Sequence, residues 1–73
     1  MVKAAVLVSV APGKVDAVSE IVKKMGVRDV LSVSGRADLV VLLEGSRSEV
    51  SEEIKKMLVI EGVNATEALW EVE

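Results

Sequence analysis

The sequence contains no cysteine, histidine, phenylalanine or tyrosine, and it has a single tryptophan and a single proline. Without cysteine the chain cannot form a disulfide bond, and without histidine it also lacks the other side chain that most often binds zinc. Its serines have no imidazole beside them, and there is no thiol to act as a nucleophile. We therefore expect no catalytic residue, no metal site and no cofactor, and the protein is predicted not to be an enzyme.

Positive charge is also scarce, since nine lysines and arginines stand against twelve aspartates and glutamates and the net charge is −3. The two Lys-Lys pairs share their predicted helices with acidic residues, which is typical of a solvated face of mixed charge and not of a phosphate-binding stripe. Trp70 is the one aromatic side chain that could stack on a base. We expect no direct binding of nucleic acid.

Long apolar segments are missing as well. The run over residues 2–10 is interrupted by Lys3 and Ser9, and it is too short to cross a membrane. It is not preceded by a secretory signal. These features predict a cytoplasmic protein that does not bind membranes.

Two short runs, residues 4–8 and 39–43, are nevertheless apolar without a break. Successive side chains of a strand point to opposite faces of a sheet, so an unbroken run indicates burial on both faces. The two helical segments of this chain are best placed on one face. A domain of 73 residues is also marginal alone, because small domains bury only about 60% of the surface that the unfolded chain exposes. We therefore expect a second copy of the chain to cover the other face.

The chain reads as an internal duplication, because short segments recur in the same order. They are Val18-Ser19-Glu20 with Val50-Ser51-Glu52, Lys23-Lys24-Met25 with Lys55-Lys56-Met57, and Gly26-Val27 with Gly62-Val63. Each half predicts a strand, a helix, a glycine and a second strand. The two glycines, Gly26 and Gly62, are expected to end the helices in the left-handed conformation.

Hydrophobic periodicity and turn residues place these elements along the chain. The strands are predicted at residues 3–10, 28–34, 38–44 and 65–72, and the first helix at residues 14–25. The second helix runs to residue 58, with Ser46 as its N-cap and Glu49 completing a capping box. Two such halves make the βαββαβ order of an α+β, ferredoxin-like fold. Right-handed connections predict an antiparallel sheet in the order 4-1-3-2, with both helices on one face.

A short polar segment, Ser34-Gly35-Arg36-Ala37-Asp38, joins the two halves. A glycine in such a turn can take a positive φ and leave neighbouring N–H groups free. Free N–H groups beside a carboxylate would hold a zwitterion, the amides taking its carboxylate and Asp38 its ammonium group. An ordinary hairpin whose turn is capped by Asp38 explains the same residues, and the residues alone favour that interpretation.

Three segments together resemble the effector domain, or RAM domain, of the Lrp/AsnC transcription regulators. They are Val8-Ser9-Val10 with Pro12-Gly13, Val33-Ser34-Gly35-Arg36-Ala37-Asp38-Leu39-Val40-Val41, and Ile60-Glu61-Gly62-Val63 with Thr66. The resemblance covers essentially the whole chain and implies a ferredoxin-like fold whose subunits pair sheet against sheet, as a dimeric α/β barrel. It also implies rings of dimers, commonly octamers, and a small effector, usually an amino acid, bound between dimers. The matching effector-binding positions are Ser34, Gly35, Arg36, Asp38 and Thr66.

The chain departs from the family pattern in three ways. It has no room for the family's N-terminal helix-turn-helix, so residues 1–73 are expected to form a single effector domain that does not bind DNA itself. Ala37 occupies a hairpin position where the family often has an aromatic residue. Ala68 stands where a second threonine is common.

We hypothesise that the protein is an oligomeric, amino-acid-binding module that modulates transcription regulators by co-assembly with full-length Lrp/AsnC relatives. In this hypothesis Arg36 and Asp38 hold the charged ends of the ligand, and Gly35 allows its close approach. One alternative is a purely structural assembly module, which the two alanines favour slightly. Another is an enzyme of the dimeric α/β-barrel type, whose polar interior the central strands do not supply. An ACT-type amino-acid sensor has the same element order, but the hairpin favours the Lrp type.

Overall fold

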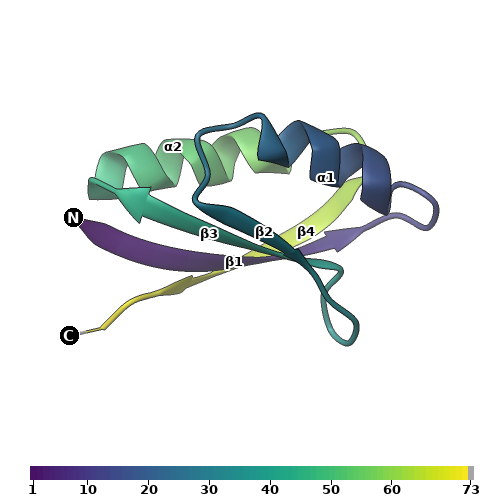
Figure 1. Ribbon diagram of the computed structural model, residues 1–73, viewed down its shortest axis with the longest axis horizontal. Helices are drawn as coiled ribbons and strands as arrows, with labels where there is room; N and C mark the ends of the chain where they lie inside the picture. Colours follow the sequence, from purple (N-terminus) through teal and green to yellow (C-terminus); the bar gives the residue numbers. More distant parts are fainter. Residues whose placement is uncertain (73) are drawn as a thin grey trace.

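A computed structural model describes residues 1–72 of the chain, and its elements follow the predicted order. They are β1 (Val2–Val10), α1 (Val15–Lys23), β2 (Asp29–Ser32), β3 (Leu39–Gly45), α2 (Arg47–Leu58) and β4 (Val63–Trp70). The strands form one sheet in the order β2-β3-β1-β4, with every neighbouring pair antiparallel. Both helices lie across the same face of this sheet (Figure 1). The ferredoxin-like fold, the sheet order and the placement of the helices are thus confirmed.

The core lies between the helices and the sheet. The register pairs Val6 of β1 with Val41 of β3, and both side chains point toward the helices. The largest fully buried side chains come from both helices and both central strands: Val6, Val8, Val18, Val22, Leu39, Val41, Val50 and Met57. Every second residue of the two apolar runs therefore enters this core, and the residues between them face the other way.

The two helices begin differently, although the repeat aligns their first residues. At α2, Ser46 Oγ accepts a hydrogen bond from the Glu49 N–H at 3.1 Å, and Glu49 Oε1 accepts one from the Ser46 N–H at 2.8 Å. This is the predicted capping box, which satisfies two N–H groups that a helix start leaves unpaired. The N-cap of α1 is Lys14, whose side chain makes no capping hydrogen bond. The second half of the repeat therefore has the stronger helix start.

The capping box makes a small part of the stability dependent on pH. Hydrogen bonds with the backbone and then the side chain of Ser46 lower the pKa of the Glu49 carboxyl. The resulting contribution to the free energy of unfolding is complete above the pKa that this carboxyl has in the unfolded chain, and it is lost as the pH falls through the lower folded-state pKa. We expect Glu49→Gln, which keeps an oxygen acceptor for the Ser46 N–H but loses the negative charge at the helix N-terminus, to lower the melting temperature slightly at pH 7 and to have less effect in acid, below the folded-state pKa. Equal losses at both pH values in thermal unfolding monitored by circular dichroism would contradict this.

The aligned glycines adopt different conformations. Positive φ angles occur at Gly13, Gly35 and Gly62, but not at Gly26. The C-cap of α1 is Lys24, whose N–H bonds back to the Ile21 carbonyl before the chain reaches Gly26. The prediction that Gly26 ends α1 in the left-handed conformation is therefore wrong. Gly62 has a φ of +100°, but it lies in the turn into β4, since the C-cap of α2 is Val59.

A β-bulge moves the start of the last strand from the predicted residue 65 to Val63. Ser9 pairs with Ala65 and Val10 pairs with Val63, so β4 carries one extra residue, Asn64, at this point. The bulge brings Val63 against the core. An alternating pattern does not reveal an inserted residue, which explains the difference in the boundary.

The face of the sheet opposite the helices, which we call the open face, is uncovered and largely apolar. Its apolar side chains come from all four strands: Ala5, Leu7, Leu31, Val40, Leu42 and Leu69. Leu31 is 46% exposed and Leu69 is 50% exposed. The same face also carries polar side chains, which are Lys3, Ser9, Asp29, Glu44 and Glu67. Within residues 1–72, no helix is long and apolar enough to span a membrane.

Candidate functional site

The hairpin between β2 and β3, residues 33–38, projects from the sheet on the side away from the helices (Figure 1). Its ends are tied by a hydrogen bond from the Val33 N–H to the Asp38 carbonyl at 3.0 Å. Gly35 has a φ of +129°, which L side chains rarely adopt, so the predicted need for glycine at this turn is confirmed. A Cβ at Gly35 would meet no atom within 4 Å, and the tip of the hairpin is therefore open.

Asp38 fastens the hairpin to the end of β1 through its backbone and its side chain. Its N–H donates to the Val8 carbonyl at 2.9 Å, and its Oδ2 accepts a hydrogen bond from the Val10 N–H at 2.8 Å. The pairing of β1 with β3 ends at Val8 and Leu39. The hydrogen bond from the Val10 N–H to the Asp38 carboxylate therefore holds the two segments together beyond the last paired residues. The side chain expected to meet a ligand's ammonium group is thus already engaged in holding the hairpin.

Arg36 extends from the hairpin to β4. Its Nη2 lies 2.7 Å from Glu67 Oε1, and this ion pair joins the hairpin to a strand that is not a neighbour of β2 or β3 in the sheet. The two side chains are 77% and 49% exposed, respectively. Water screens such a pair, so we expect it to add little to the stability of the fold. Its position is more informative than its strength, because it places opposite charges side by side at the open face.

The ion pair borders a hollow of about 340 Å³ at one end of the open face. The lining residues come from β1, the hairpin and β4: Leu7, Ser9, Arg36, Ala65, Thr66 and Glu67. Two of the predicted effector-binding residues, Arg36 and Thr66, therefore border this hollow, although the Thr66 side chain lies on the helix side of the sheet, since Thr66 pairs with the buried Val8. The other three do not line it, because Ser34 and Gly35 lie in the exposed part of the hairpin and Asp38 faces the end of β1.

Glu67 and Ser9 are the polar lining residues that the sequence reasoning missed. The sequence pattern explains Glu67 as one of the charges that protect an edge strand from uncontrolled pairing. It explains Ser9 as an interruption of an apolar run. Alternation along the last strand predicts correctly that Glu67 and Thr66 point to opposite faces of the sheet. No local pattern shows that the hairpin reaches past β1 to that strand.

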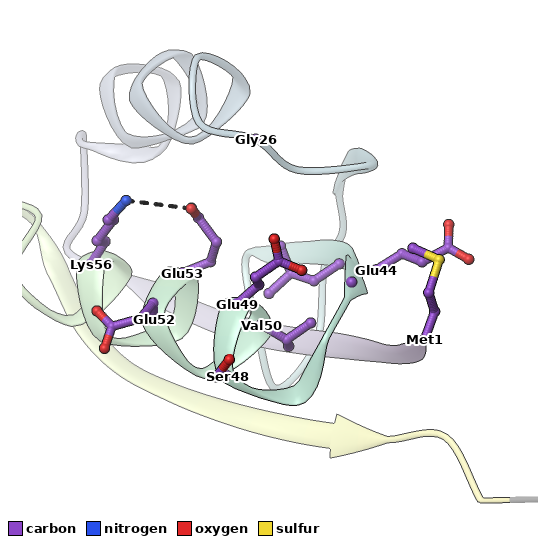
Figure 2. Close-up of a pocket in the computed structure, with 11 residues that line it drawn as sticks. Met1, Gly26, Glu44, Ser48, Glu49, Val50, Glu52, Glu53 and Lys56 are labelled. Atoms are coloured by element: carbon purple, nitrogen blue, oxygen red, sulfur yellow. Dashed lines mark hydrogen bonds and ion pairs between the residues drawn. The ribbon is translucent and has the colours of Figure 1, made fainter.

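A larger and more acidic hollow, of about 630 Å³, lies between α2 and the segment that follows α1 (Figure 2). Its charged lining consists of Glu44, Glu49, Glu52, Glu53 and Lys56. Glu49 caps α2, and Glu53 Oε1 lies 3.4 Å from Lys56 Nζ, as the dashed line in Figure 2 shows. In the part of the chain that the structure describes, no three acidic residues are arranged to hold a metal ion. These observations assign no ligand to the acidic hollow.

Comparison with solved structures finds chains of similar length with the same fold. TTHA0845 from Thermus thermophilus matches with a TM-score of 0.94 and 32% identity, over 100% of this chain and 95% of that chain. FFRP-DM1 matches with a TM-score of 0.91 and 27% identity, over 99% of this chain and 100% of that chain. PHS023 from Pyrococcus horikoshii has a TM-score of 0.89 and 26% identity, over 100% and 92% of the two chains. No protein-family model matches the sequence, and neither does any curated protein.

Longer regulators match over about half of their length. AsnC from E. coli has a TM-score of 0.86 and 12% identity, over 99% of this chain and 51% of that chain. The feast or famine regulatory protein Rv3291c from M. tuberculosis, in complex with L-methionine, has a TM-score of 0.73 and 18% identity. The match covers 100% of this chain and 51% of that chain. At these identities the likeness establishes a shared fold.

Proposed function

Since this chain belongs to the Lrp/AsnC family of regulators and corresponds to their effector (RAM) domain, we propose that it is an oligomeric module that binds an amino acid and modulates transcription regulators. The observation that carries the proposal is the hollow whose lining includes Arg36 and Thr66, two of the predicted effector-binding positions. The methionine bound to a longer protein of the same fold supports an amino acid as the class of effector. A cytoplasmic location, where such regulators would meet DNA, belongs to this proposal.

We propose that two copies pair through the open face, sheet against sheet. The helices leave the apolar side chains of this face uncovered, and removing apolar surface from water is the main favourable contribution to association. A twofold arrangement would present the same surface from each copy. Dimers would then assemble into rings such as octamers, and full-length Lrp/AsnC regulators could join through the same contacts.

The effector site in this proposal contains Ser34, Gly35, Arg36, Asp38 and Thr66. Asp38 would act on the ligand through the hairpin that it anchors, because its Oδ2 is bonded to the Val10 N–H. Replacing Asp38 by alanine would remove this anchor together with the charge. Asp38→Asn removes the charge alone, since its amide oxygen can still accept the hydrogen bond from the Val10 N–H. It is therefore the variant that tests whether the charge of Asp38 matters for effector binding.

A panel of amino acids in thermal unfolding tests the proposed function. An effector present at 100 times its dissociation constant stabilises the folded state by about 2.7 kcal/mol. For a domain of this size we expect the melting temperature to rise by several degrees with one amino acid or a few related ones. If no amino acid at millimolar concentration moves a visible melting transition, the module does not bind this class of effector.

A purely structural assembly module is the second candidate. It is favoured by the state of the hairpin, in which Ala37 is only 6% exposed and Asp38 already has a backbone partner. Such a hairpin is held without a ligand. A chain that forms its oligomer and shows no response across the amino-acid panel would be this module.

A further inference from the structure

Lys3 and Glu44 are the charged residues that the two central strands place on the open face. The other open-face residues of β1 and β3 are Ala5, Leu7, Ser9, Val40 and Leu42. Within residues 1–72 Lys3 forms no ion pair, although it is the cross-strand neighbour of Glu44, whose Oε1 lies 3.1 Å from Arg28 Nη1. A charge at an apolar contact surface costs free energy unless it gains a partner there. A second copy packed on this face therefore needs a group that pairs with Lys3.

The strand order and register show which residues meet when two open faces pack together. The order β2-β3-β1-β4 places the centre of the sheet between β3 and β1. A twofold axis that runs along the strands at this centre lays β1 of one copy over β3 of the other, so that residues at the same level of the sheet face each other. Because Lys3 and Glu44 are partners in the register, Lys3 then faces Glu44 of the second copy. By symmetry the same contact forms twice.

The other twofold arrangement places no acidic residue directly opposite Lys3. An axis in the plane of the sheets but across the strands lays β1 over the β1 of the second copy in reverse, so that Lys3 faces Ser9 near the far end of that strand. Packed sheets keep their strand directions within about 30° of each other, so these two arrangements are the ones to compare. Charge complementarity favours the axis along the strands.

The remaining charged residues of the open face have partners in their own chain. Asp29 and Glu67 belong to the edge strands β2 and β4. Asp29 Oδ1 accepts a hydrogen bond from the Val30 N–H at 2.8 Å, and Glu67 Oε1 lies 2.7 Å from Arg36 Nη2. The Glu44 carboxylate can accept from Arg28 and from a lysine together, since its two oxygens offer about four acceptor positions.

We propose that Lys3 of each copy pairs with Glu44 of the other, and that these two ion pairs fix the orientation of the dimer and select its partner. This inference rests on the proposed pairing of open faces and names the residues that direct it. Charged groups across an interface contribute more to specificity and register than to raw affinity. The face fits a second copy of this chain, and it rejects a chain in which the two positions carry like charges.

Charge reversal in separate chains, followed by sedimentation equilibrium, tests this inference. The variants are Lys3→Glu and Glu44→Lys. Each variant alone brings like charges together twice in its own dimer, so we expect its dissociation constant to rise on the order of 100-fold or more. In an equimolar mixture every contact between chains joins opposite charges again. We expect the mixture to form dimers with a dissociation constant within about tenfold of that of the unsubstituted chain.

Two controls accompany the mixture. Lys55→Glu and Glu52→Lys reverse the charges of an exposed ion pair on α2, off the open face, and each should leave the chain dimeric. The double variant Lys3→Glu/Glu44→Lys restores opposite charges within a chain as well as between chains, so it should dimerise alone. Circular dichroism shows whether each variant is folded.

Four outcomes separate the possibilities. Folded single variants that are monomeric apart and dimeric when mixed support the inference. If the mixture stays monomeric, the two charges act within one chain, and the inference is wrong while the proposed pairing of open faces stands. Single variants that dimerise as tightly as the unsubstituted chain also overturn the inference alone. An unsubstituted chain that is monomeric at every concentration overturns the pairing of open faces itself, and the inference fails with it.

Discussion

We expect Leu69→Glu to leave the chain monomeric at concentrations where the unsubstituted chain is a dimer. Leu69 lies on the open face, where it is 50% exposed and pairs with Ala5 of the adjacent central strand. If two open faces pack together, the introduced carboxylate loses its water without gaining a partner, which costs several kcal/mol. A twofold interface carries this change twice. The dissociation constant should therefore rise on the order of 1,000-fold or more.

Leu58→Glu is the matched control for this experiment. Leu58 is 53% exposed, so the same substitution is made at nearly the same exposure, but at the end of α2 and off the open face. We expect it to preserve the dimer. Sedimentation equilibrium gives the mass of each variant, and circular dichroism shows whether each remains folded. A folded Leu69→Glu variant with the mass of a dimer would mean that the open face is not the interface.

Gly62→Ala should cause a large loss of stability, about 2 kcal/mol or more. Gly62 has a φ of +100°, and a Cβ there would lie 3.0 Å from Lys14 Cβ and 3.2 Å from Val18 Cγ2. Val18 is fully buried, at 0% exposure, and has no room to move aside. For a domain of this size the melting temperature should fall by about 10 °C or more.

Gly26→Ala is the control within the repeat. Gly26 has no positive φ, and a Cβ there would meet no atom within 4 Å. Alanine at such a position reduces the freedom of the unfolded chain, so we expect an unchanged or slightly higher melting temperature. Similar losses in the two variants, measured by differential scanning calorimetry, would show that the aligned glycines have equivalent roles after all.

The repeat predicted the order of elements well and their ends less well. Val18 and Val50 occupy matching positions in the two halves, and both are fully buried, at 0% and 1% exposure. Met57 lies inside α2, however, whereas its counterpart Met25 follows α1, which already ends at Lys23. The halves start from similar sequences, but each helix ends where its own packing and hydrogen bonding allow. Similarity between segments therefore predicts the type of an element more reliably than its boundary.

The hairpin shows which part of a site local sequence can predict. The need for glycine at residue 35 follows from a known turn preference, and the structure has it. The expected capping of the turn by Asp38 is wrong, because its carboxylate accepts the N–H of Val10 in β1, 28 residues away. The ion pair between Glu67 and Arg36 does not follow in this way. Glu67 and Arg36 are 31 residues apart, and the contact exists because the hairpin reaches past β1.

The sequence by itself determined the order of strands and helices, the central places of β1 and β3, and the uncovered apolar face. These features depend on the spacing of apolar residues and on the handedness of connections, which any chain with this pattern shares. Only the tertiary structure decided which side chains meet at the hollow and which glycine is irreplaceable. Those outcomes depend on the bulge at Asn64, the reach of Arg36 and the closeness of Gly62 to Val18. Each is a contact between distant segments, and local periodicity carries no information about such contacts.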